Sequence, residues 1–212
     1  MGSNFGDLDN DGYLDFYIGT GDPDFRSLMP NRMFRNDGGK QFQEVTESGG
    51  FGHLQKGHGV SFADLDNDGD QDIFTVMGGA YEGDGYMNAL FENPGGFENN
   101  WITLLFEGTQ SNHFGIGTRI TINVATPAGD RTIYRTVTTG SSFGSNSLQQ
   151  EIGLGNATSV QSIQVFWPAS GKEQVFKDVK MNAFHLVAEH KDQLETLERS
   201  EIKLGSGEMH LN

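Results

Sequence analysis

The chain has 212 residues and a formal net charge of −15, from 29 acidic and 14 basic side chains. A negative excess of this size argues against nucleic acid or an anionic membrane surface as a partner, because both attract positive charge. The absence of cysteine excludes disulfide bonds and thiolate metal sites, and no apolar run approaches the ~20 residues of a membrane-spanning helix.

An acidic stretch lies near the start of the chain and is followed by short predicted strands. The sequence DLDNDGYLD occupies 7–15, and the apolar run at 14–18 predicts a strand. A further strand is predicted at 32–35, and the turn sequence NDGG at 36–39 leads into another at 41–45. With a short strand before the acidic stretch, the unit has four antiparallel strands, which is typical of one β-propeller blade.

The same order recurs further along the chain. Asp7 and Asp64 lie 57 residues apart, and DLDNDGDQD at 64–72 repeats the acidic stretch. The block NRMFRN at 31–36 aligns at the same offset with NALFEN at 88–93. Because two separate blocks share one offset, the sequence indicates an internal repeat with two copies.

Each acidic stretch places carboxylates on alternate positions of a short loop. The predicted metal ligands are Asp7, Asp9, Asp11, the carbonyl of Tyr13, and Asp15 in the first loop, and Asp64, Asp66, Asp68, the carbonyl of Asp70, and Asp72 in the second. Like charges this close repel one another unless a cation lies among them. A set of hard oxygen ligands suits Ca²⁺ better than Zn²⁺ or the more tightly hydrated Mg²⁺. We therefore predict two calcium sites, with a solvated acidic hairpin turn as the alternative interpretation.

Glycine at the sixth position of each loop, Gly12 and Gly69, permits a sharp turn. An EF-hand loop has Glu at its twelfth position, whereas this chain has Ile18 and Thr75 there. The loops are therefore predicted to join strands rather than helices. In such a hairpin the calcium either only fixes the loop or also contacts a ligand, and the sequence leaves both open.

The second half of the chain shows strand-like alternation without a convincing helix. The predicted strands lie at 101–106, 119–125, 132–138, 162–167 and 184–189. Turn sequences separate them, so a small β-sandwich or barrel is expected. Residues 190–204 are predicted to form a short helix or a loose tail.

Candidate catalytic residues are few. The serines at 141–142 lie outside any G-x-S-x-G sequence, and no spacing of Ser, His and Asp predicts a triad. Trp101 and Trp167 fall within apolar strands, which favours packing in the core. Arg119 is a candidate ion-pair partner of Glu151. We therefore expect no catalysis by this chain.

The first half resembles FG-GAP or VCBS repeats. The resemblance rests on F-x-D-L-D-N-D-G-x-x-D followed by N-R-x-F-R-N and a glycine-rich turn, and it covers 1–97, with repeats at about 1–57 and 58–97. Such repeats form blades of calcium-binding β-propellers in integrin α-like and bacterial surface proteins. The resemblance implies an extracellular, periplasmic or cell-surface location.

The second half resembles an ASPIC/UnbV domain, which habitually follows FG-GAP repeats in secreted bacterial proteins. The matching segments are NWITL at 100–104, NHFGIGTRI at 112–120, QEIGLG at 150–155 and VFWPASG at 165–171. The domain is assigned to 98–190, and 191–212 to a charged tail. The expected fold is all-β: two four-stranded blade-like repeats, forming a partial β-propeller, and a C-terminal sandwich or barrel.

The resemblance and the two loops predict a calcium-binding extracellular module for binding or adhesion, with an unknown protein or carbohydrate ligand. One alternative is a polysaccharide-active enzyme or its accessory domain, which needs converging carboxylates outside the two loops. Another is a structural spacer. Because two blades cannot close a ring, we expect a fragment of a longer protein with further blades, packing of the blades against the second module, or self-association. We favour a fragment whose two repeats stack on the C-terminal domain.

Overall fold

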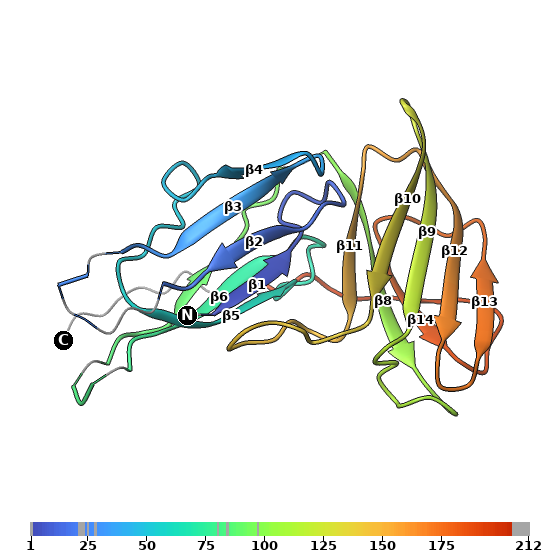
Figure 1. Cartoon of the computed structure of the whole chain (residues 1–212). Coiled ribbons are helices and arrows are strands. Elements are labelled where there is room, and N and C mark those ends of the chain that lie inside the picture. The colour runs from blue at the N-terminus through green and yellow to red at the C-terminus, as the bar shows by residue number, and fades with distance from the viewer. Residues whose placement is uncertain are drawn as a thin grey trace.

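The computed structural model describes residues 2–20, 24, 26–27, 29–79, 81–83, 85–96 and 98–204. Among these residues the structure has β-strands and no helices, which confirms the all-β prediction. Figure 1 shows the strands gathered in two lobes, with the N-terminal repeats in one and the second half of the chain in the other. No helix long and apolar enough to cross a membrane occurs in the described part of the chain.

The first repeat is a four-stranded antiparallel sheet. Its strands are neighbours in chain order: β1 (Ser3–Gly6), β2 (Asp15–Ile18), β3 (Arg32–Asp37) and β4 (Gln41–Glu44). The β3–β4 turn contains Gly38 and Gly39 at φ angles of 59° and 75°, which glycine adopts without a steric cost. This repeat therefore has the four strands predicted from its sequence.

The second repeat has three strands among the described residues: β5 (Gly57–Ala63), β6 (Asp72–Met77) and β7 (Ala89–Phe91). The offset from β4 places a fourth strand at 98–101, but Asn100 instead begins β8 (Asn100–Glu107), which belongs to the second lobe. There β8 buries Ile102 and Leu104 completely in a larger apolar core. The second repeat thus departs from the four-stranded prediction, because burial of these side chains stabilises β8 in the other lobe.

The two repeats share one apolar core between their sheets. Its buried members are Tyr17 and Met33 from the first repeat and Val60, Phe62 and Ile73 from the second. Strand β1 lies beside β5, and the Asn4 side chain donates a hydrogen bond of 2.9 Å to the Val60 carbonyl.

The second lobe is a β-sandwich of two four-stranded sheets. One sheet has the order β10 (Gly129–Thr136), β9 (Arg119–Thr126), β12 (Ser159–Trp167) and β13 (Lys172–Phe176), and the other has β11 (Gln150–Gly155), β8, β14 (Phe184–Ala188) and β15 (Glu195–Leu197). Alternate residues of both sheets meet in a single core. Trp167 is fully buried there, as predicted, and its indole N–H donates to Gln174 at 2.5 Å.

The segment predicted as a short helix or loose tail contains a strand instead. β15 pairs antiparallel with β14, with Leu197 opposite Phe184. Beyond it the backbone N–H of Ile202 donates to the carbonyl of Asp66 at 2.6 Å, so the chain returns to the second acidic loop. Residues 205–212 of the predicted tail lie outside the described residues.

Candidate metal centres in the two acidic loops

The first acidic loop joins β1 to β2 and brings three carboxylates together. One oxygen each of Asp7, Asp9 and Asp15 lies within 4.8 Å of the others, and all three side chains are buried. Asn10 and Gly12 adopt φ angles of 54° and 87°. These two left-handed residues reverse the backbone, so that alternate side chains converge on one point.

Backbone N–H groups hold some of these carboxylate oxygens in place. The N–H of Gly12 donates to Asp7 Oδ2 at 2.9 Å, and the N–H of Leu8 donates to Asp15 Oδ2 at 2.9 Å. Asp15 Oδ1 accepts a third bond of 2.7 Å from the N–H of Asn36 on β3. The loop is therefore shaped by its own carboxylates and anchored to the neighbouring strand.

The second loop, between β5 and β6, repeats this scaffold residue by residue. Asn67 and Gly69 have φ angles of 61° and 96°. The N–H of Gly69 donates to Asp64 Oδ2 at 3.2 Å, and Asp72 accepts from the N–H groups of Leu65 at 3.2 Å and Asn93 at 2.8 Å. Each of these bonds has a counterpart in the first loop at the 57-residue offset.

The remaining predicted ligands lie in or beside the same clusters. In the second loop the converging group consists of Asp64, Asp66 and Asp68. Asp11 bends back to accept a bond of 2.7 Å from the N–H of Tyr13. The predicted carbonyl ligands at Tyr13 and Asp70 stay predictions, as do the roles of all ten residues in binding an ion.

Buried oxygen atoms without a partner point to a cation at both loops. Among the described residues, Asp7 Oδ1, Asp64 Oδ1 and Asp70 Oδ1 are buried and accept no hydrogen bond. A buried carboxylate oxygen that accepts no hydrogen bond from the protein is costly, and a bound cation removes that cost. Because the donors are hard oxygens from carboxylates, the arrangement fits Ca²⁺.

Several carboxyl groups in each loop hold protons more tightly than usual. Burial raises the pKa of Asp7 to about 8, although the nearby Arg135 guanidinium opposes the shift. Burial likewise raises the pKa of Asp15 and Asp64 to about 7 and that of Asp70 to about 8, with neighbouring carboxylates adding to each shift. A cation among these groups favours their charged forms and displaces the protons.

Comparison with protein families identifies both halves of the chain. A model of the FG-GAP-like repeat matches residues 7–75, and a model described as ASPIC and UnbV matches residues 108–194. Along the chain, the FG-GAP-like match comes first and the ASPIC and UnbV match follows it. The predicted family resemblance is thereby confirmed, in the predicted order. A search of curated proteins found no match.

The first loop of the FG-GAP-like repeats contacts three arginines. Arg35 on β3 donates to Asp9 Oδ2 at 2.6 Å. Two arginines come from β10 of the ASPIC and UnbV domain: Arg131 donates to the Asp11 carbonyl at 2.6 Å, and Arg135 Nη2 lies 3.8 Å from Asp7 Oδ2. The sequence did not predict these domain contacts, because nothing local marks which strand faces the loop.

The second loop contacts the ASPIC and UnbV domain through an aromatic ring. Gly69 lies so close to Trp101 on β8 that a Cβ atom at this position would overlap the indole. Trp101 also contacts the Phe184 ring, with centroids 5.1 Å apart. This ring was predicted to lie in the core, but it is half-buried, with its indole against the metal loop.

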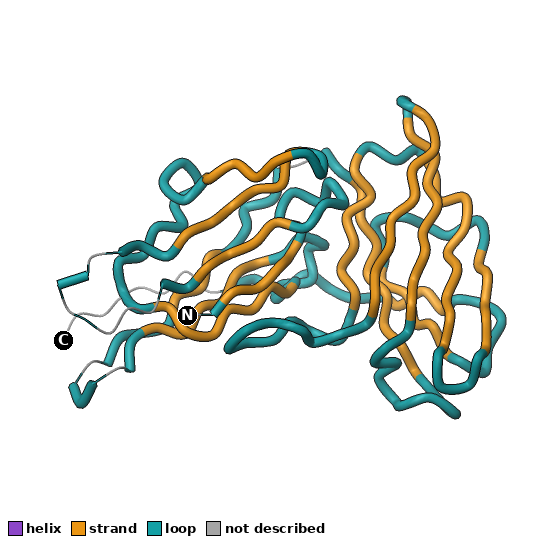
Figure 2. Tube along the Cα trace, in the orientation of Figure 1, coloured by secondary structure: helices purple, strands orange, loops and turns teal. Residues whose placement is uncertain are grey.

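Polar side chains tie the first loop to β11 as well. The N–H of Asp7 donates to the Gln71 side chain at 2.6 Å, and Gln71 in turn donates to Glu151 at 2.5 Å. The predicted pairing of Arg119 with Glu151 is wrong: Arg119 instead lies over the Phe166 ring, 5.8 Å from its centroid. The pair is separated because β9 and β11 belong to opposite sheets of the sandwich. Figure 2 shows the repeat loops turned toward the second lobe.

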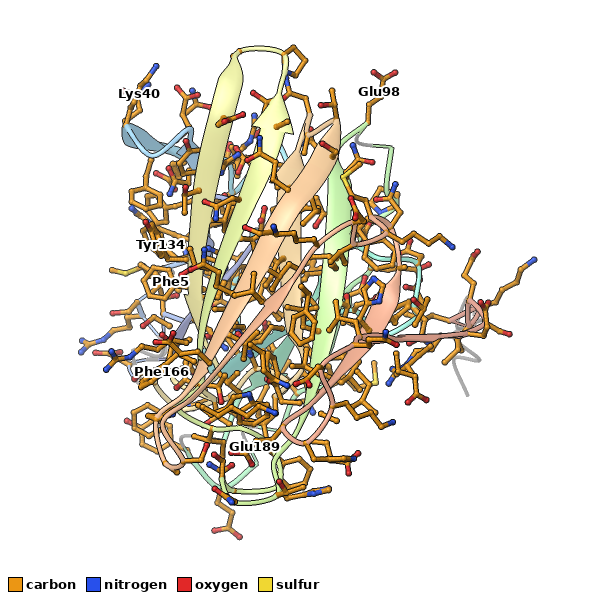
Figure 3. The ribbon with its side chains drawn as sticks, turned by 90° about the vertical axis from the view of Figure 1, so that its right-hand side faces the viewer. Phe5, Lys40, Glu98, Tyr134, Phe166 and Glu189 are labelled. Carbon is orange, nitrogen blue, oxygen red and sulfur yellow. The ribbon has the colours of Figure 1, made fainter. Side chains whose placement is uncertain are left out.

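A cleft of about 390 Å³ lies between the first repeat and the ASPIC and UnbV domain. Two exposed aromatic rings line it, Phe5 from β1 and Tyr134 from β10, which lie on the same edge of the molecule in Figure 3. Amide side chains such as Asn146 and Gln149 complete its wall. Glu151 is the one carboxylate among the described residues that line the cleft.

Proposed function

We propose that the chain is a calcium-binding extracellular module that binds a ligand, with one Ca²⁺ ion in each acidic loop. The observation that carries the proposal is the set of buried, unpartnered oxygens at Asp7, Asp64 and Asp70. Two loops with the same backbone bends and the same hydrogen bonds support one site in each loop, although the converging carboxylates differ in one position. The ion stabilises each hairpin, because it satisfies oxygens that the fold leaves without donors.

Thermal unfolding tests the calcium sites. An ion that binds only the folded chain at a hundredfold excess over its Kd adds about 2.7 kcal/mol of stability. For a chain of this size that gain raises the Tm by roughly 5–11 °C relative to chelator. Asp7→Asn and Asp64→Asn should each lose part of the rise, whereas Glu173→Gln, an exposed acid on β13, should keep all of it. An equal Tm in calcium and in chelator would overturn the proposal.

The cleft beside Phe5 and Tyr134 supports binding rather than catalysis. Glycoside hydrolysis uses a pair of carboxyl groups, whereas Glu151 stands alone in the cleft lining and already accepts bonds from Gln71 and Gln149. Exposed aromatic rings beside amide groups suit a carbohydrate, which presents apolar ring faces and hydroxyl groups. The ligand class we propose is therefore a carbohydrate outside the cell.

A glycan array in calcium tests this part of the proposal. Tyr134→Ala should reduce binding, because it removes one ring from the cleft without touching either acidic loop. Val175→Ala, an exposed apolar residue on β13, is the matched control and should bind as the unchanged chain does. Absence of any glycan bound by the unchanged chain would exclude carbohydrate, and hydrolysis of a bound glycan would show that the chain is an enzyme.

A further inference from the structure

The two faces of each repeat sheet differ in their side chains. In the first repeat, aligned residues of β1, β2 and β3 form two rows across the sheet, one on each face. The Tyr17 row consists of Asn4, Tyr17 and Met33, and the Phe16 row consists of Phe5, Phe16 and Phe34. The Tyr17 row faces the second repeat, and the Phe16 row faces away from it.

The second repeat has two equivalent rows, but the row that faces inward in the first repeat faces outward in the second. The Ile73 row consists of Phe62, Ile73 and Phe91, and the Phe74 row consists of Ser61, Phe74 and Leu90. At the 57-residue offset the Phe16 row corresponds to the Ile73 row, and the Tyr17 row corresponds to the Phe74 row. The Ile73 row faces the first repeat, which leaves the Phe74 row on the outside.

The contact between the repeats shows how these rows fit together. Tyr17 and Met33 share a core with Phe62 and Ile73, and the rings of Tyr17 and Phe91 lie 6.0 Å apart. A Tyr17-type row therefore packs against an Ile73-type row. Among the described residues, one row of each type remains without such a partner, and these two rows lie on opposite sides of the pair of repeats.

Both outer rows are accessible and mainly apolar, with Ser61 as the polar member of the Phe74 row. Phe5 is 48% exposed, and Phe74 and Leu90 are 37% and 43% exposed. Phe16 stacks on Phe34 with ring centroids 4.6 Å apart, which gives the first outer face a continuous aromatic surface. The 141–146 segment reaches only the edge of the other face, where Ser61 donates to the Ser145 carbonyl at 2.7 Å.

We propose that a second copy of the chain covers these faces, with Phe74 and Leu90 of one copy packed against Phe16 and Phe34 of the next, so that Phe5 stays in the wall of the cleft. In this arrangement Phe34 of one copy lies against Phe74 of its neighbour as Phe91 lies against Tyr17 within the chain. A second copy is the occupant because each chain carries both halves of the contact. The interface is head to tail, so each assembly has one free row at either end. Further copies can bind to these rows and form an open chain, unless the ends meet and close a ring.

Complementary variants test this geometry by light scattering after gel filtration in calcium. The unchanged chain should form species larger than a monomer, in proportions that increase with concentration. Phe34→Lys and Phe74→Lys should each be monomeric alone at the same concentrations. Their equimolar mixture should form a species of two-chain mass and nothing larger, because each variant keeps the row that the other lacks. Val175→Lys, on the exposed face of β13, should associate as the unchanged chain does.

A cooperative unfolding transition shows that each variant is folded. If Phe34→Lys does not fold, Phe42→Lys replaces it, because Phe42 lies on the same face and is 49% exposed. A monomeric unchanged chain at every concentration would overturn the proposal. If the Phe74→Lys variant still forms oligomers, the proposal is also overturned. That result is expected if two Phe16 rows pack face to face. Because association is read as mass, its failure is separate from a failure of calcium or glycan binding.

Discussion

Arg35 lies beside a predicted calcium ligand in the first loop and has no cationic counterpart in the second. Its Nε donates to Asp9 Oδ2 at 2.6 Å, while the equivalent position of the second repeat is Glu92. A guanidinium at this distance occupies one carboxylate oxygen and repels an approaching Ca²⁺. We therefore expect Arg35→Gln to strengthen calcium binding at the first loop.

The exposure of the pair sets the size of this effect. The side chain of Arg35 is 50% exposed and that of Asp9 only 5%. Half-exposed pairs of this kind are worth about 0.2–1 kcal/mol after screening by water. Since about 1.4 kcal/mol corresponds to a tenfold change in affinity, the expected gain is roughly 1.5-fold to 5-fold.

Calorimetric titration of calcium measures the gain directly. An Asp64→Asn background weakens the second loop, so that the heat comes from the first. Arg119→Gln, an exposed arginine beside Phe166, serves as the control and should change nothing. The reciprocal change Glu92→Arg should weaken the second loop by a similar factor. Unchanged or weaker binding by Arg35→Gln would refute the reasoning and show that Arg35 shapes the loop instead.

Three further predictions concern stability and proton binding. Gly69→Ala should lower the free energy of unfolding by about 1–3 kcal/mol more than Gly79→Ala, because both have positive φ but only Gly69 lies against Trp101. Glu189→Gln should cost about 1.5–3 kcal/mol, because a neutral amide accepts the hydrogen bonds donated by the 109–111 turn more weakly than the buried carboxylate does. Calcium binding near neutral pH should release protons into a weakly buffered solution, since burial raises the pKa of Asp7 to about 8.

The stabilities contributed by Glu189 and by Asp7 should depend on pH in opposite ways, because the pKa of Glu189 is lowered and that of Asp7 is raised. Burial raises the pKa of Glu189, but bonds from the Ser170 hydroxyl and the 109–111 turn outweigh it and leave the pKa below its usual 4.5. Ionised Glu189 contributes its full stability above pH 4.5. The difference in free energy of unfolding between the unchanged chain and Glu189→Gln should therefore shrink as the pH falls. A difference that stays constant with pH would contradict a stabilising role for the ionised carboxylate. Asp7 behaves oppositely: in chelator, stability should decline as pH rises between 3.8 and about 8, and calcium should reverse the decline.

The sequence predicted what is local or periodic. Glycine at the sixth position of each loop predicted the sharp bends, and the 57-residue offset predicted that the two loops are alike. Alternation predicted the sandwich strands β8, β9, β10, β12 and β14, but it did not predict β11, β13 and β15. All of these features depend on residues close in sequence or on an exact repeat.

Contacts between the lobes were not predictable in the same way. The Arg131 bond to Asp11 joins residues 120 positions apart, and the Arg135 bond to Gly12 joins residues 123 apart. Such pairs depend on how two domains pack, and no local pattern encodes that. The fourth strand of the second repeat was mispredicted for the same reason. The repeat offset predicts a blade strand at 98–101, but packing in the core of the second lobe places residues from Asn100 onward in β8.

Both acidic loops lie at the junction of the two lobes, so the calcium ions proposed for them would have a second role in the fold. Asp7 Oδ2 accepts bonds from Gly12 of its own loop at 2.9 Å and from Gly153 on β11 at 3.2 Å, so one carboxylate shapes the loop and holds the neighbouring domain. Gly69 likewise both turns the second loop and lies against Trp101. When a cation fixes these loops, it also fixes the surfaces on which the ASPIC and UnbV domain rests. Loss of calcium should therefore loosen the packing between the lobes before it unfolds either core.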